Sequence, residues 1–546
     1  MTDSGPTTSA ATRDCIRGAP PVLHLRLAQE PPRVWAPLDA FLYNLMTTNV
    51  AVSFGLPLIA GAAFYFPIGA MTTAILVAGA FCLAEALVYA FLVSSFPKNG
   101  GDYVFQRRLL NGPVAAVFAF TGVVVGGALW MAIAGWFASR IAVGPFLLFL
   151  GNGLDNQSIT AAGRWVLSTQ GLVALGLAAT IWSALINIWG MRAYARVQRA
   201  LLLAGLIALS VLVAYLALTR LSINQSAYQA IIYKAVESGF SRQGRTGGTE
   251  AMLALLPVVA FGLIYPGWVA FQAAEVKRVG ELRVQMATIV GGKAVSILFA
   301  LIALPLPIRH IGEELFGASV YLAVNDPSSF WVLAPRLFAL GPAPWLGSVI
   351  LVSLAVAINT WFWMWVPNHT LAASRVLLAM SRDRLMPRWL GELRHNGAPG
   401  KAIVAFSTVC CGLVLLYADL GVWRLALHAT LVNLIAFGLT CAAAALFPYT
   451  RRELFRDSTA APFGVARVPV ITLAGGAFVA FSAFLVWRYV TSDVLGLGTD
   501  LTETLLSLGA LYGASAGVTL VFRRYRRRIE GAEVEVYYRE ISSPRR

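Results

Sequence analysis

The sequence predicts an all-α polytopic membrane protein with twelve transmembrane helices. The chain has 546 residues, of which 58% are hydrophobic and 12% are charged. A soluble domain carries about a quarter charged residues, so this composition leaves too little polar surface for a globular protein in water. Apolar stretches recur along the chain, and each is roughly long enough to cross a ~30 Å hydrocarbon layer as a helix. Backbone groups in lipid must pair within their own segment, which favours helices here.

Apolar runs between charged or Pro/Gly-rich breaks define the expected elements in chain order. The twelve predicted spans lie near 39–62, 68–94, 113–139, 165–188, 197–219, 251–273, 285–307, 344–374, 402–418, 423–447, 468–489 and 501–522. We expect an N-terminal tail at 1–34, two five-helix halves at 35–220 and 250–448, two additional helices within 449–522, and a basic tail at 523–546.

The distribution of Lys and Arg predicts the orientation. With the N-terminus inside, the predicted inner segments hold 31 of the 42 Lys and Arg residues, the outer segments hold ten, and Lys293 lies within a span. Cytoplasmic loops are enriched in these residues, so both termini are expected in the cytoplasm and the chain in the cell membrane. The net charge of +16 is then a topology signal that also favours anionic lipid headgroups. Nucleic-acid binding is not expected.

Cysteine usage and short motifs exclude several other classes. Four of the five cysteines lie in apolar segments and Cys15 lies in the polar tail, so no disulfide framework is expected. The first 35 residues lack the apolar core of a signal peptide. The sequence contains no His-Glu-x-x-His, no Gly-x-x-x-x-Gly-Lys-Ser/Thr and no Cys-x-x-Cys. We therefore expect no enzyme, no ATP-driven pump, no cofactor and no metal.

Two predicted spans contain helix-breaking residues near their middle. The first span reads Ser53-Phe54-Gly55-Leu56-Pro57, and the sixth ends its apolar run in Leu263-Ile264-Tyr265-Pro266-Gly267. Proline removes a donor and glycine eases unwinding. The breaks are five spans apart, so they occupy equivalent positions in two halves of opposite topology. Paired breaks of this kind indicate the central site of a transporter, whereas a single one would be an ordinary proline kink.

The space between the two breaks is the expected binding site. Freed N–H groups of half-helices can hold a carboxylate, and freed carbonyls can hold an ammonium or a metal cation. The residues expected to line the site are Ser53, Phe54, Gly55, Leu56, Phe261, Gly262, Leu263, Ile264 and Tyr265. We expect Gly55→Trp to abolish uptake while leaving expression intact.

Three loop motifs follow spans 2, 6 and 8. They are Phe96-Pro97-Lys98-Asn99-Gly100-Gly101-Asp102-Tyr103, Ala274-Glu275-Val276-Lys277, and the segment from Arg375 through Met380, Arg382 and Asp383 to Pro387. They resemble the Pro-x-x-Gly-Gly-x-Tyr, Glu-Glu-Val-Lys and Arg-x-x-x-x-Met-x-Arg-Asp-x-x-x-Pro motifs of the amino acid–polyamine–organocation (APC) superfamily. The likeness covers roughly residues 36–448.

This resemblance implies a five-plus-five inverted repeat with broken helices 1 and 6, the LeuT-like arrangement. It implies a secondary active permease for an amino acid or related amine, with alternating access and coupling to a proton or sodium gradient. The alternatives are an uncoupled facilitator of a neutral solute and a non-transporting membrane scaffold with a permease fold.

Two stretches depart from the family pattern. The first helix of the family usually reads Gly-x-Gly-Ile-like at its break, where this chain has Ser53-Phe54-Gly55-Leu56. A Gly-Phe-Glu-like stretch in span 6 is replaced by Leu263-Ile264-Tyr265. An amine, a larger apolar amino acid and a solute that is not an amino acid therefore stay open as substrates.

Two charged residues lie within predicted spans. Glu85 is in the middle of span 2, where a charge costs at least a few kcal/mol unless it is paired, hydrated or protonated. It is a candidate proton carrier or ammonium partner, or else a protonated structural acid. Lys293 in span 7 either pairs with Glu85 or extends to the inner interface, and we favour the interface.

Span 8 carries further candidates for ion coupling. Sodium-coupled relatives of the family use hydroxyls of span 8 with carbonyls of span 1, and Ser353, Asn359 and Thr360 could serve in this way. Glu85 is the separate candidate for a proton, and neither ion is excluded. The run Trp361-Phe362-Trp363-Met364-Trp365 could bind an organic cation, but its tryptophans cannot share one helical face. We expect most of them to contact lipid. His369, His428 and Asn433 are expected to make structural interhelical hydrogen bonds.

Overall fold

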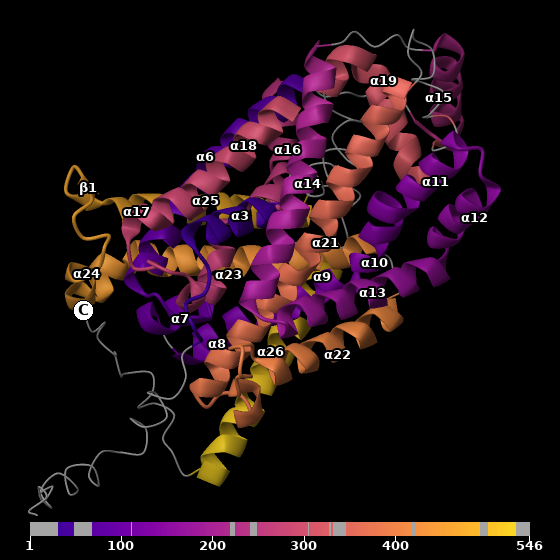
Figure 1. Cartoon of the computed structure of the whole chain (residues 1–546). Coiled ribbons are helices and arrows are strands. Elements are labelled where there is room, and N and C mark those ends of the chain that lie inside the picture. Colours follow the sequence, from indigo (N-terminus) through magenta and orange to yellow (C-terminus); the bar gives the residue numbers. More distant parts are fainter. Residues whose placement is uncertain are drawn as a thin grey trace, which may run out of the picture.

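The computed structural model describes residues 31–48, 68–110, 112–218, 224–240, 248–303, 305–326, 329–330, 333, 345–417, 422–491 and 501–530. Within these ranges the chain is almost entirely helical (Figure 1). The described strands are a two-residue antiparallel pair, β1 (Gly464–Val465) and β2 (Val468–Pro469). The first predicted break, Ser53 to Leu56, lies outside the described residues.

The first half of the chain forms a series of helices, several of which begin at or directly after a Gly, Pro or Asn residue. In order they are α3 (Pro37–Thr48), α6 (Ile68–Ser95), α7 (Asp102–Leu109), α8 (Gly112–Ala119), the π-helical η3 (Phe120–Val125), α9 (Gly126–Ala132), α10 (Ala134–Phe137), the π-helical η4 (Ala138–Val143), α11 (Gly144–Gly153), α12 (Gln157–Val166), α13 (Thr169–Ile188), α14 (Met191–Leu218) and α15 (Gln225–Glu237). Asn156, Ser168 and Asn224 cap α12, α13 and α15 through their side chains, which satisfies otherwise unpaired N–H groups.

The second half continues the same pattern. Its elements are α16 (Gly248–Leu263), the 3₁₀-helical η5 (Pro266–Glu275), α17 (Leu282–Gln285), the π-helical η6 (Met286–Gly291), α18 (Gly292–Ala303), α19 (Pro305–Asn325), α21 (Trp345–Arg382), the 3₁₀-helical η7 (Arg388–Gly391), α22 (Gly400–Tyr417), α23 (Val422–Thr450), α24 (Arg452–Arg456), α25 (Val470–Thr491) and α26 (Leu501–Glu530).

Ten described helical segments are long and apolar enough to cross a membrane. They are Ala70–Ser95, Gly112–Ala132, Ala134–Gly153, Thr169–Ile188, Met191–Tyr215, Gly248–Glu275, Leu282–Ile302, His428–Thr450, Val470–Thr491 and Leu501–Arg528. Two of these correspond to the predicted third span, which continues past residue 139 with a kink at Ile133. Gly400–Leu416 is a shorter apolar helix. The protein is therefore a multi-pass membrane protein, while the count of twelve and the inverted repeat stay predictions.

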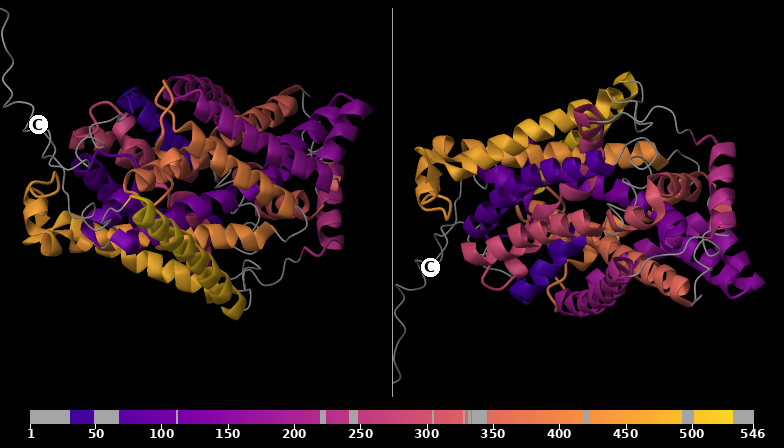
Figure 2. Two further views of the ribbon diagram at one scale, coloured as in Figure 1. Left: turned by 90° about the horizontal axis from the view of Figure 1, so that it is seen from below. Right: turned by 90° about the horizontal axis from the view of Figure 1, so that it is seen from above.

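One large apolar core joins most of these helices, and a small separate cluster lies between α15 and α19 at one end (Figure 1). Neither α15 nor α19 was predicted, because both lie in stretches interpreted as outer loops. Helices α25 and α26 run along one side of the bundle (Figure 2). Only 11% of the apolar part of α26 is buried inside the protein. Such a helix needs another apolar environment for its surface, which a bilayer supplies.

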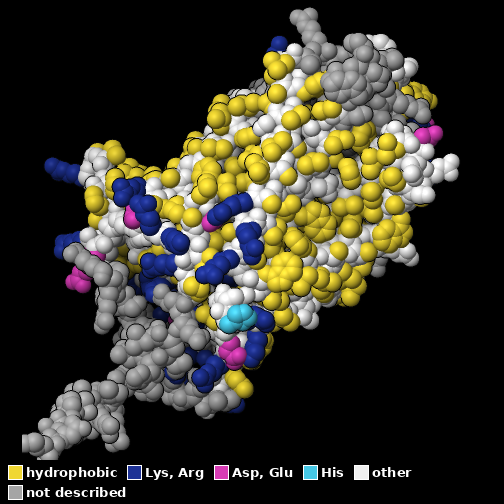
Figure 3. Space-filling view, viewed as in Figure 1, with side chains coloured by type: hydrophobic (Ala, Val, Ile, Leu, Met, Phe, Trp, Pro, Cys, Tyr) yellow, Lys and Arg dark blue, Asp and Glu magenta, His cyan; other side chains and the backbone are white. Residues whose placement is uncertain are grey.

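Lys and Arg side chains gather at one end of the molecule, over β1, α17 and α7, and the face beyond them is largely apolar (Figure 3). We call this end the basic end; α15 and α12 lie at the opposite end (Figure 1). The asymmetry matches the charge distribution predicted from the sequence.

Candidate functional site

The helix of the predicted sixth span is interrupted at Ile264 and Tyr265, between α16 and η5. Tyr265 has a non-helical backbone (φ −120°, ψ 39°), and the following Pro266 has no N–H to continue the ladder. Gly267 then lets the chain approach α6, because a Cβ there would overlap the ring of Tyr89. The sequence thus places a break deep in the bundle, where Leu263 and Ile264 are fully buried.

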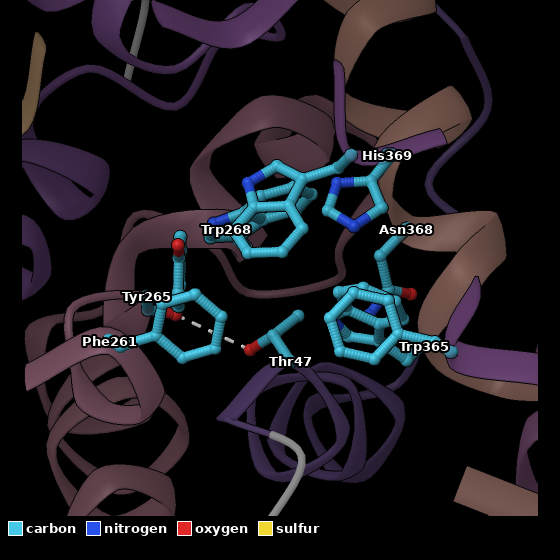
Figure 4. A pocket seen from close by; sticks show the side chains of 9 residues that line it. Thr47, Phe261, Tyr265, Trp268, Trp365, Asn368 and His369 are labelled. Atoms are coloured by element: carbon cyan, nitrogen blue, oxygen red, sulfur yellow. Dashed lines mark hydrogen bonds between the residues drawn. The ribbon is translucent and has the colours of Figure 1, made fainter. Parts of the chain in front are cut away.

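A pocket opens at this break (Figure 4). Side chains from six elements meet there: α3, α9, α10, α16, η5 and α21. The lining residues are Thr47, Trp130, Phe137, Phe261, Tyr265, Trp268, Trp365, Asn368 and His369. None of these described lining residues is acidic, and none is Lys or Arg, so a bound solute would meet aromatic faces and a few dipoles.

The aromatic side chains of the pocket pack against one another. The Trp130 ring lies 5.2 Å from that of Phe261 and 5.7 Å from that of Trp365, both edge to face. His369 lies 4.8 Å from Trp365 and 5.0 Å from Trp268. Ring faces carry partial negative charge and can attract an ammonium group. The rings leave a cavity of only about 10 Å³ between them, roughly the space of one water molecule, so a larger solute must separate the rings.

Several polar atoms of the pocket lack a hydrogen-bond partner among the described residues. They are both ring nitrogens of His369, Nδ2 of Asn368, Nε1 of Trp268 and Oη of Tyr265. Buried polar groups are normally paired, so these atoms are available to a ligand. Others are held in place: Trp130 Nε1 donates to Asn433 Oδ1 at 3.0 Å, and Thr47 Oγ1 donates to the carbonyl of Tyr265 at 3.3 Å.

Next to the break, a buried ammonium joins two helix ends. Lys293 is 1% exposed, and its Nζ donates to Thr48 Oγ1 at 2.8 Å and to the carbonyl of Leu263 at 2.6 Å. The expectation that Lys293 extends to the inner interface is therefore wrong. A hydroxyl at the end of α3 and a free carbonyl at the end of α16 stabilise its charge inside the bundle. Glu85 is fully buried on α6, the helix that packs against α18, which carries Lys293.

The three loop motifs come together at the basic end. Arg375 and Glu275 are buried, and Arg375 donates to both carboxylate oxygens, from Nε at 3.0 Å and from Nη2 at 3.2 Å. Asn99 adds a bond from Nδ2 to Glu275 Oε1 at 3.0 Å and accepts from the backbone N–H of Ala274 at 2.8 Å. We call Asn99, Glu275 and Arg375 the basic-end cluster; it ties η5 and α21 to the loop after α6.

Two other carboxylates of the loop motifs, Asp383 and Asp102, make further interactions between distant parts of the chain. Asp383 accepts from Tyr103 Oη at 2.8 Å and forms an ion pair with Arg107. Asp102 Oδ1 accepts from Thr440 Oγ1 at 2.6 Å and from Tyr89 Oη, while its Oδ2 has no described partner. Burial raises the pKa of Asp102 to about 6, and the two hydroxyl donors limit that rise.

The structure brings together only part of the predicted site. Phe261 and Tyr265 line the pocket, whereas Gly262, Leu263 and Ile264 form its adjoining backbone. Glu85 lies outside the lining. Of the span 8 candidates, Thr360 Oγ1 donates to the carbonyls of its own helix at 2.8 and 3.1 Å, and Asn359 donates to Ala142 and Ala355. Ser353 is buried and also lies outside the lining.

The expectation of lipid contact for the span 8 tryptophans is wrong for two of them. Trp361 is 0% exposed, and Trp365 is buried and lines the pocket. The sequence also failed to single out Thr47, Trp130 and Trp268, and it took His369 as structural. Helical spacing could have linked Trp365 to His369, four residues later on the same face of α21.

Two comparisons bear on this arrangement. A family model described as amino acid permease matches residues 40–506, which includes the break, the pocket and all three motifs. No curated protein matches the chain.

Proposed function

The chain belongs to the amino acid permease family, and from this premise we propose that it is a secondary transporter for an amino acid or a related amine, working by alternating access. Membership in this family indicates a membrane-embedded transporter of a small molecule rather than an enzyme. The pocket at the break of α16 is the observation that supports this use of the fold.

The pocket suits a solute that has an apolar body and a small number of hydrogen-bonding groups. Its aromatic rings provide an apolar contact surface for the side chain of the solute, and their faces weakly attract an ammonium group. His369, Asn368 and Trp268 supply polar atoms that need partners. Because Thr47 is near the end of α3, the following stretch Ser53 to Leu56 is proposed as the remaining wall.

Alternating access requires the basic end to open and close around this pocket. The basic-end cluster joins η5, which carries Trp268, to α21, which carries Trp365 and His369. We propose that the cluster is intact when the path toward the basic end is closed, and that this end faces the cytoplasm. A proton or sodium gradient is proposed as the driving force.

The test is uptake into liposomes that contain the purified protein. Labelled amino acids and amines are first screened for ligands that raise its thermal stability, and the best ligands are then assayed for uptake and exchange. His369→Phe removes both free ring nitrogens but keeps an aromatic ring, so it is expected to raise KM about two- to tenfold, the value of one hydrogen bond. His395→Phe, at an exposed loop position, is the matched control.

Failure of the wild-type protein to move or exchange any amino acid or amine would contradict the proposal and favour a scaffold. Uptake that is insensitive to a protonophore and to removal of sodium would favour an uncoupled facilitator. An unchanged KM in His369→Phe would remove the pocket from the substrate path.

A further inference from the structure

A lysine in the interior of a membrane protein needs a reason to be there, and the surroundings of Lys293 supply one. Its two acceptors are the side-chain hydroxyl of Thr48 on α3 and the backbone carbonyl of Leu263, the last residue of α16 before the break. The C-terminal ends of helices carry partial negative charge, which favours the charged ammonium. Lys293 therefore holds the two helix ends together directly beside the pocket, where Thr47 and Tyr265 also meet.

The carboxyl group of Glu85 is in the opposite situation. It is 0% exposed, and neither of its oxygens has a hydrogen-bond partner in the described part of the chain. An ionised carboxylate without partners at such depth costs several kcal/mol or more. The arrangement therefore fits a neutral Glu85 and a charged Lys293 that donates its hydrogen bonds to Thr48 and Leu263.

The other titratable groups near Glu85 lie on α6 itself and on elements close to it. They are Cys82 and Tyr89 on α6 itself, Lys293 on α18, Tyr265 at the break, Cys441 on α23 and Asp102 at the start of α7, with Tyr489 of α25 donating to the carbonyl of Pro257 at 2.7 Å. Thiols and phenols are neutral near pH 7. Asp102 is itself an acid, and its carboxylate already accepts from two hydroxyls. Among the groups named here, Lys293 is therefore the cation that can respond to a charge on Glu85.

We propose that Glu85 and Lys293 form a proton-binding site that couples the transport of the proposed function to a proton gradient. When Glu85 carries the proton, Lys293 stays on Thr48 and Leu263 and keeps the ends of α3 and α16 joined. When the proton leaves the carboxyl group, the resulting carboxylate attracts the ammonium. Lys293 then gives up its bonds to Thr48 and Leu263, and this deprotonated form returns the empty pocket across the membrane, a step that exchange of substrate does not need. One proton enters from one side and leaves to the other in each cycle.

The decisive variant is Glu85→Gln, which imitates the neutral acid and cannot release a proton. In liposomes with substrate on both sides, its exchange rate is expected to stay within about twofold of wild type. Under an imposed gradient of one pH unit, the wild-type protein should accumulate substrate up to about tenfold for one proton per substrate. Glu85→Gln should show no accumulation. Glu237→Gln, in an exposed pair with Lys234, is the matched control and should behave as wild type.

A second measurement does not depend on transport. At roughly pH 8, where Asp102 is ionised, the infrared spectrum of the wild-type protein should contain the C=O stretch of a protonated buried carboxyl group, and Glu85→Gln should lack it. Identical spectra would overturn the proposal, as would proton-driven accumulation by Glu85→Gln or accumulation driven by sodium alone. A wild-type protein that moves no substrate but shows the band would instead refute the proposed function and leave the proton site standing.

Discussion

The basic-end cluster provides the sharpest stability test. Glu275→Gln replaces one carboxylate oxygen by an amide NH₂ and leaves the Arg375 guanidinium buried without its counter-charge. Gln keeps an oxygen for Asn99, so this neighbouring bond survives and the perturbation is confined to the charge. Both members of the pair are almost fully buried, at 0% and 2% exposed, so solvent cannot screen the loss.

Removal of one partner from a buried pair costs about 3–5 kcal/mol. We expect Glu275→Gln to lower the free energy of unfolding by an amount in this range, measured by circular dichroism during reversible unfolding in mixed detergent micelles. The double variant Glu275→Gln with Arg375→Met removes the unpaired charge as well. It should recover about 0.5–3 kcal/mol of the loss, the usual size of a coupling between residues in contact.

Glu281→Gln is the matched control, because Glu281 binds Arg278 and Arg283 at the exposed surface near the same end. Surface pairs contribute little to stability, so this variant should unfold as wild type does. The reasoning is refuted if Glu275→Gln is no less stable than the control, or if the double variant loses the plain sum of the two single losses.

Two other predictions concern packing and pH. Gly135→Ala should destabilise the protein by about 1–3 kcal/mol, because its Cβ would overlap the carbonyl oxygen of Leu172 where α10 crosses α13. Gly153→Ala, with open space around the site, should not; equal effects in the same unfolding assay would disprove the argument. Burial raises the pKa of Asp102 to about 6 from 3.8. Protonation of Asp102 therefore raises the free energy of unfolding by about 3 kcal/mol; this gain is fully present below about pH 4 and is lost as the pH rises through 6. The stability of wild type relative to Asp102→Asn should therefore increase between pH 7 and pH 5, and a constant difference would contradict the assignment.

The broken sixth span could be predicted because its cause is local. Pro266 and Gly267 interrupt any helix in which they occur, whatever surrounds them. The residues on either side, Phe261 and Tyr265, then line the pocket for geometric reasons. The motifs after spans 2, 6 and 8 are recognisable as sequence patterns, but the residues that contact one another in them are up to 280 positions apart, so these contacts could not be predicted from any one segment.

The remaining pocket residues depend on which face of an apolar helix points inward. In a soluble protein that face is marked by polar residues on the opposite side. In a membrane protein both sides are apolar, so nothing in the run Trp361 to Trp365 distinguishes the side that packs from the side that contacts lipid. The buried position of Lys293 could not be predicted for a related reason. A lysine near a span end usually reaches the interface, and only the free carbonyl of Leu263, from a distant helix, makes the interior a better place for its charge.

One short segment links all of these features. Between Phe261 and Glu275 the chain lines the pocket, supplies the carbonyl that binds Lys293, and reaches the basic-end cluster. The break at Tyr265 separates α16 from η5, and Gln272 has a non-helical backbone (φ −111°, ψ 25°) within η5. A solute that separates the pocket rings would displace Trp268 near the start of η5, and the same short segment carries Glu275 at its other end. Ligand binding and opening of the basic end would then be parts of one movement, and a variant that weakens the cluster should also change ligand affinity, although Glu275 does not line the pocket.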